Sequence, residues 1–130
     1  MAAVASRMIS GTCHCGAVSI DVPAPPASLL SCNCSLCRRT GGLWAFYAPQ
    51  DVRVSGHPEH TEAYVWGDRT LRTVRCRHCG SVTHWESLQP QVDQRCGVNF
   101  RNFAPELVAS LPVRRFDGAD TWAFLDDDPA

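Results

Sequence analysis

Three short cysteine clusters constrain the fold of this chain more than any other feature of its sequence. Seven of its eight cysteines form a middle group of three and one pair on either side. The middle cluster is Cys32, Cys34 and Cys37, and the outer cysteines are Cys13, Cys15, Cys76 and Cys79. Short spacings of this kind are typical of metal sites, where the fold brings remote pairs around one ion. We expect the rest of the chain to be the framework that holds these clusters.

The number of thiols in each group predicts how the clusters bind metal. A structural zinc has four ligands in a closed tetrahedron, whereas a catalytic zinc has three protein ligands and an open fourth position. We therefore predict one structural zinc at the outer cysteines and a second, labile catalytic zinc at the middle cluster. The eighth thiol, Cys96, is either a fourth ligand that closes the middle site or a small buried side chain.

Disulfide bonds are the alternative use of eight cysteines in so short a chain. A disulfide framework is typical of secreted proteins, but the apolar run at the start of the sequence is brief and ends at Arg7. Cys-x-Cys pairs are also poor disulfide partners. We therefore expect a cytoplasmic protein with reduced thiols. For the middle cluster, free thiols without metal are the other interpretation.

The composition excludes several partners and one type of chemistry. The formal net charge is −1, so we expect neither nucleic acid nor an anionic membrane surface as a partner. No apolar run approaches the length of a membrane span. All 12 basic residues are arginines, and the absence of lysine excludes Schiff-base chemistry on an aldehyde. We expect one domain over residues 1–130, and the sequence leaves its oligomeric state open.

Short strands separated by turns are expected along most of the chain. Alternating apolar residues predict a strand over 17–22, and Gly67-Asp68 predicts the turn of a hairpin between strands 63–66 and 71–75. Further strands are expected at 43–47, 52–54, 82–85, 94–100, 113–116 and 122–124, and helical turns at 35–40 and 105–110. This pattern predicts an all-β fold of mainly short antiparallel strands, stapled by the four-cysteine zinc site.

The motifs around the cysteines resemble those of a known family. Gly11 to Val18 reads G-x-C-x-C-G-x-V, Cys32 to Gly41 reads C-x-C-S-x-C-R-R-T-G, and Cys76 to Ser81 reads C-x-x-C-G-S. In this order they resemble the glutathione-dependent formaldehyde-activating enzymes, which are relatives of centromere protein V with an Mss4-like fold. The resemblance covers nearly the whole chain, and it implies a structural zinc at the outer cysteines and a catalytic zinc at the middle cluster.

The chain departs from the family at one position inside the middle cluster. Position 33 is Asn here, whereas His is common in the family. The residue lies between two ligands and is not itself one, so the metal assignment is unchanged. The departure leaves the choice of substrate open.

Three functions fit these residues. The first is a zinc-dependent carbon–sulfur lyase-type enzyme that condenses glutathione, or a similar thiol, with formaldehyde or another small aldehyde, with Cys32, Cys34 and Cys37 as the catalytic metal ligands. Arg38 and Arg39 directly follow these ligands and are the predicted substrate-binding residues, because a guanidinium pairs well with a carboxylate. The second is a non-catalytic thiol carrier, and the third is a zinc-stapled protein-interaction module.

The histidines give a weaker signal. We expect His14 and His78, which lie inside the outer pairs, to point away from the metal. No spacing among His57, His60 and His84 marks a metal site, and surface or core positions are the expected outcome for them.

We predict that Cys76→Ser abolishes soluble folded protein. Metal binding in small domains is coupled to folding, with apparent free energies of about 10–16 kcal/mol in zinc-finger peptides. Expression in the soluble fraction and thermal unfolding test this. Recovery of the variant with unchanged thermal stability would remove the structural assignment of the outer cysteines.

Overall fold

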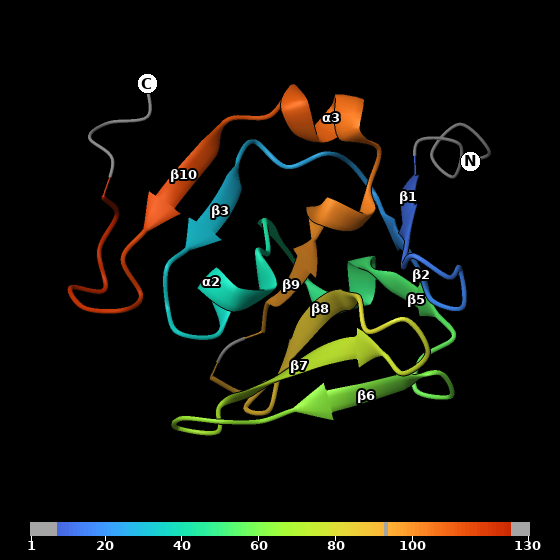
Figure 1. The fold of residues 1–130 in the computed structure, drawn as a ribbon, viewed down its shortest axis with the longest axis horizontal. Helices are drawn as coiled ribbons and strands as arrows, with labels where there is room; N and C mark the ends of the chain where they lie inside the picture. Colours follow the sequence, from blue (N-terminus) through green and yellow to red (C-terminus); the bar gives the residue numbers. More distant parts are fainter. Residues whose placement is uncertain (1–7, 93, 126–130) are drawn as a thin grey trace.

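The computed structural model describes residues 8–92 and 94–125, which form two β-sheets and a few short helices (Figure 1). The prediction of an all-β fold is confirmed. The helical segments of the described residues are α2 (Cys37–Thr40), η1 (Pro49–Asp51), η2 (Phe100–Asn102) and α3 (Pro105–Ala109). None of these helices is long and apolar enough to cross a membrane.

The smaller sheet has three antiparallel strands in the order β1-β2-β5. Its strands are β1 (Ile9–Thr12), β2 (Ser19–Val22) and β5 (Arg53–Ser55). In β2, Ile20 and Val22 are fully buried, whereas Ser19 and Asp21 are only partly buried. This is the alternation expected of a strand with one face on the core. The turn between β1 and β2 carries the first pair of outer cysteines.

The larger sheet has seven strands in the order β10-β3-β4-β9-β8-β7-β6. They are β3 (Leu29–Cys32), β4 (Trp44–Tyr47), β6 (Thr61–Tyr64), β7 (Leu71–Cys76), β8 (Val82–Ser87), β9 (Cys96–Asn99) and β10 (Val113–Phe116). Neighbouring strands are antiparallel except β3 and β10, which are parallel and lie side by side at one end of the fold (Figure 1).

Most predicted strands are present, with a few differences. The hairpin of β6 and β7 turns through Gly67, whose φ of 63° suits glycine. The predicted helical turns correspond to α2 and α3. The prediction of a strand over 122–124 is wrong: Trp122 has a φ of 58°, and only Phe124 forms an isolated bridge, with Phe116. Strands β1 and β3 were not predicted.

The hydrophobic core lies between the two sheets. Its fully buried members come from β2, β3, β4, β9 and the segment around η2. They are Ile20, Val22, Leu29, Leu43, Ala45, Val98, Phe100 and Phe103. The rings of Phe100 and Phe103 stack with centroids 4.2 Å apart. A separate small cluster of Cys13, Val18 and Cys76 connects the sheets at the outer cysteines.

We predict that Gly11→Ala destabilises the fold by about 1–3 kcal/mol, the usual cost of overpacking. A Cβ at Gly11 would lie 2.6 Å from the backbone oxygen of Asn102 and 2.7 Å from the ring of Phe103, and a backbone atom cannot move aside cheaply. Chemical denaturation measures the change. Thr12→Ala, an exposed change in the same strand, is the control and should stay within about 0.5 kcal/mol of the parent. Equal stabilities of the two variants would contradict this packing.

Candidate metal centres

The structure brings the four outer cysteines together from two distant turns. Cys13 and Cys15 lie between β1 and β2, whereas Cys76 ends β7 and Cys79 lies in the turn before β8. Cys15 Sγ is 3.7 Å from Cys13 Sγ and 3.6 Å from Cys76 Sγ, and all four sulfurs lie within 4.8 Å of one another. Zn–S bonds of about 2.3 Å in a tetrahedron put sulfurs about 3.8 Å apart. These distances therefore fit a zinc site, and all eight cysteines are free of disulfide bonds.

Backbone N–H groups donate hydrogen bonds to several of these sulfurs, and the pKa values of Cys76 and Cys79 are lowered, whereas that of Cys15 is raised to about 11. Val18 N donates to Cys13 Sγ at 3.3 Å, and His78 N donates to Cys76 Sγ at 3.4 Å. The hydroxyl and N–H of Ser81 lower the pKa of Cys79 to about 5. Hydrogen bonds to the charged form favour ionisation, so this corner of the fold suits a cation.

The middle cluster is a half-buried group of three thiols at the end of β3. Cys32 closes that strand and Cys37 begins α2, and the three sulfurs lie within 4.8 Å of one another. Cys34 N donates to Cys32 Sγ at 3.4 Å, and Cys37 N donates to Cys34 Sγ at 3.3 Å. Burial opposes ionisation of Cys34, but the hydrogen bonds from Cys37, Cys32 and the Leu36 backbone together outweigh it, and the pKa of Cys34 is lowered. Burial raises the pKa values of Cys32 and Cys37, so only Cys34 favours the thiolate in the absence of a metal.

Trp44 places an indole N–H donor near Cys37. Burial raises the pKa of Cys37, and the indole acts weakly against that rise. Trp44 Nε1 is buried and forms no hydrogen bond of full geometry with another described residue. A metal-bound thiolate at Cys37 is a stronger acceptor than a thiol and would satisfy it. The residues present thus fit a zinc ion at this site.

The C-terminal segment packs against the middle cluster through Asn33. Its amide Nδ2 donates to Asp117 Oδ1 at 3.0 Å, and Ala119 N donates to Asn33 Oδ1 at 3.0 Å. This bond and those from Thr121 lower the pKa of Asp117. A Cβ at Gly118 would lie 2.5 Å from Cys32 Sγ. Asn33 is the unusual residue of the middle cluster, and no motif in the sequence identifies Asp117 as its partner.

The arginines near the middle cluster differ in how they are held. Arg38 and Arg39 are exposed on α2. Arg39 Nη1 donates to the Ser35 carbonyl at 2.6 Å, whereas the Arg38 guanidinium makes no hydrogen bond to another described residue. Arg101 Nε donates to the Gly41 carbonyl at 2.9 Å, directly after α2. Both predicted substrate-binding arginines therefore lie beside the cluster, with Arg101 as a third cation.

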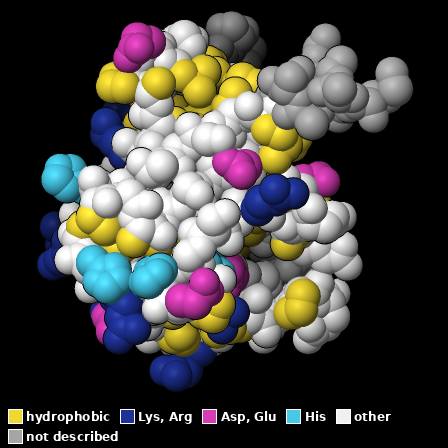
Figure 2. All heavy atoms as spheres, turned by 90° about the vertical axis from the view of Figure 1, so that its right-hand side faces the viewer, with side chains coloured by type: hydrophobic (Ala, Val, Ile, Leu, Met, Phe, Trp, Pro, Cys, Tyr) yellow, Lys and Arg dark blue, Asp and Glu magenta, His cyan; other side chains and the backbone are white. Residues whose placement is uncertain are grey.

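Two histidine groups form that the sequence did not indicate. His57, His84 and Glu86 place their ligand atoms within 4.8 Å of one another. His60 Nδ1 and His78 Nε2 lie 3.1 Å apart at the surface. Figure 2 shows neighbouring histidines on one face of the molecule, among interspersed acidic, basic and apolar side chains. The available signal for the first group was the His-x-Glu spacing, which puts two side chains on one face of a strand.

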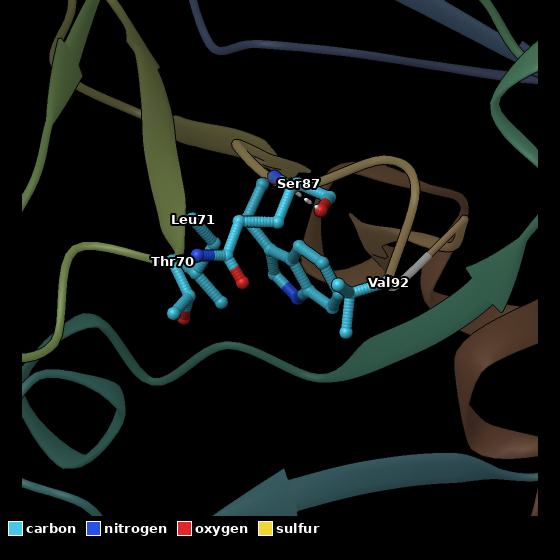
Figure 3. Close-up of a pocket in the computed structure, with 6 residues that line it drawn as sticks. Thr70, Leu71, Ser87 and Val92 are labelled. Atoms are coloured by element: carbon cyan, nitrogen blue, oxygen red, sulfur yellow. Dashed lines mark hydrogen bonds between the residues drawn. The ribbon is translucent and has the colours of Figure 1, made fainter.

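A shallow pocket of about 220 Å³ lies apart from the cysteines, on the larger sheet. Figure 3 shows Thr70 and Leu71 on one side of it, Val92 on the other and Ser87 above. Trp85 and Gln89 complete its lining. None of these residues is a metal ligand of the usual kinds, so the pocket is separate from the metal centres.

Two comparisons with known proteins name the same family, and a third gives a solved structure with a similar fold. Residues 8–108 match the model of a family described as glutathione-dependent formaldehyde-activating enzyme. A Halomonas elongata protein, provisionally named as such an enzyme, is 40% identical over 62 residues, which are 44% of this chain and 40% of that protein. The crystal structure of a Rhodobacter sphaeroides protein is 35% identical, with a TM-score of 0.67 over 81% of this chain and 99% of that one. The match thus spans less than half of the curated relative.

We predict that Gly118→Ala weakens zinc binding at the middle cluster by roughly 10-fold or more, the range seen when residues around metal ligands are changed. The added methyl would collide with Cys32 Sγ, which is fixed by its place at the end of β3. Competition with a zinc chelator measures the affinity. Asp120→Ala, at an exposed position in the same loop, is the control. Unchanged zinc affinity in Gly118→Ala would show that the loop does not press on the cluster.

Proposed function

Because the chain belongs to the glutathione-dependent formaldehyde-activating enzyme family, we propose that it joins glutathione, or a similar thiol, to formaldehyde or another small aldehyde. The observation that carries the proposal is the middle cluster, whose three close sulfurs have no fourth ligand atom grouped with them among the described residues and would leave one position of a tetrahedral site open. A structural scaffold has no need of such an open site. The outer cysteines would hold the structural zinc and the middle cluster the second one.

The proposed reaction needs no oxidant or reductant. The thiolate sulfur attacks the carbonyl carbon of the aldehyde, a carbon–sulfur bond forms, and the carbonyl π electrons move to the oxygen, which takes up one proton. The product contains every atom of both reactants, so the reaction is a carbon–sulfur lyase step written in reverse. When bound at the middle cluster, zinc would supply the charge that keeps the substrate thiol ionised at neutral pH.

The side chains around the cluster have separate tasks in this proposal. The guanidinium of Arg38, which has no hydrogen-bond partner among the described residues, would bind a carboxylate of glutathione. Arg39, already fixed by the Ser35 carbonyl, would add positive charge beside the site. Asn33 would hold the C-terminal segment against Cys32 and so limit the space left for the substrate. Such positioning of two reactants is itself a source of rate acceleration.

We predict that wild-type protein, purified without chelator, carries one zinc ion more than Cys37→Ser and gains one glutathione, whereas Cys37→Ser gains none. Native mass spectrometry counts both ligands on each chain. Cys96→Ala is the matched control, because Cys96 is a buried thiol outside both clusters. Glutathione adding equally to Cys37→Ser would exclude the middle cluster as the thiol site.

A rate measurement on the same protein preparation distinguishes an enzyme from a thiol carrier. Thiols add to formaldehyde in water without a catalyst, so binding alone can resemble catalysis. Exchange spectroscopy at equilibrium measures the rate between free and thiol-bound formaldehyde. An enzyme raises this rate in proportion to its concentration, whereas a rate independent of protein concentration would leave only the carrier.

A further inference from the structure

His57, His84 and Glu86 form a compact group of potential metal ligands that contains no cysteine. His84 and Glu86 are two residues apart on β8 and point to the same face of the sheet. His57 reaches them from the loop between β5 and β6. His57 Nε2 lies 2.8 Å and His84 Nε2 lies 2.9 Å from the same carboxylate oxygen, Glu86 Oε2. The three potential ligand atoms therefore lie close together.

Each of these side chains has a second partner that fixes its orientation. His57 Nδ1 lies 2.7 Å from Thr61 Oγ1, and His84 Nδ1 lies 2.9 Å from Thr83 Oγ1. The other oxygen of Glu86 accepts from Arg72 Nε at 2.6 Å. Metal-binding histidines characteristically donate their second ring N–H to such a partner, and metal-binding carboxylates are hydrogen-bonded in turn.

Both imidazole rings direct Nε2 at the same carboxylate oxygen, and this arrangement requires protons or a cation between the nitrogens and the oxygen. If each ring donates its Nδ1 proton to a threonine hydroxyl, both Nε2 lone pairs face a carboxylate oxygen. Those electron-rich atoms repel each other unless protons or a cation intervene. Two imidazole nitrogens and one carboxylate are a donor set that zinc and similar divalent transition metals prefer.

We propose that His57, His84 and Glu86 form a third metal site, which binds a divalent transition metal of the zinc class independently of both cysteine clusters. His84 is only 3% exposed, whereas His57 and Glu86 are 20% and 25% exposed, so the group is anchored on one side and open to solvent on the other. A metal there would tie the loop before β6 to the centre of β8. It would thus link segments that are 29 residues apart, at His57 and Glu86.

The first experiment counts zinc in His57→Asn. Full-length protein is loaded with excess zinc, desalted and measured by native mass spectrometry. The wild type should retain one zinc more than His57→Asn, whatever the occupancy of the cysteine sites. His60→Asn is the matched control, because His60 lies three residues further along the same loop, is exposed, and its ring pairs with His78 rather than with the proposed ligands.

Two results would overturn the proposal. One is an equal zinc count in the wild type and His57→Asn. The other is loss of the extra zinc in His60→Asn alone, which would assign it to the surface pair of His60 and His78. Glu86→Gln provides a second test if His57→Asn does not fold, because the amide oxygen of Gln can still accept from Arg72 while the carboxylate charge is gone. Circular dichroism shows whether each variant is folded.

A third variant tests whether the hydrogen bond that orients His57 contributes to metal binding. Thr61→Val removes the hydroxyl beside His57 Nδ1 and leaves all three ligands in place. Zinc affinity at the third site should fall about 10–100-fold, as for other partners of metal-binding histidines. A purely hydrogen-bonded group without metal predicts no change in zinc binding, so an unchanged affinity in Thr61→Val would speak against the site.

Discussion

The fold depends on the meeting of two cysteine turns that are far apart in the sequence. Cys15 and Cys76 are 61 residues apart along the chain, yet their sulfurs lie 3.6 Å from each other. One turn belongs to the smaller sheet and the other to the larger, so a metal here would join the sheets at the edge of a small core. Closing so long a loop costs conformational entropy, which metal coordination can offset in a domain of this size.

The middle cluster depends on a different long-range pairing, the parallel strands β3 and β10. Their register places Phe116 opposite Cys32, and the residues that follow Phe116 therefore turn over the cluster. Asn33 then holds Asp117 and Ala119 by hydrogen bonds on both sides of its amide. The described part of the C-terminal segment, which lies outside the proposed ligand sets, would thus form one wall of the proposed reaction site and affect which substrate fits it.

The parts of the fold that were predicted are those with local signals. The hairpin around Gly67 has a glycine turn between two strand-forming runs, and the residues of β10 form a strand with the bounds expected. Strand β3 has only four residues, Leu29 to Cys32. It is held in an extended form by β4 and by β10, and Phe116 of β10, the partner of Cys32, is remote in sequence. The segment 122–124 has strand-forming residues, but it turns back on Phe116.

The sequence by itself determined the family, the all-β class and the clustering of seven cysteines. Cysteines separated by only one or two residues can share one ion, so each cluster is visible in the sequence. Only the tertiary structure decided which remote side chains meet those groups. Asn33 donates a hydrogen bond to Asp117, and His57 contacts His84 and Glu86, because strand register and the path of the loops bring these side chains together. Register is set by the packing of whole sheet faces, so no short motif in the sequence records it.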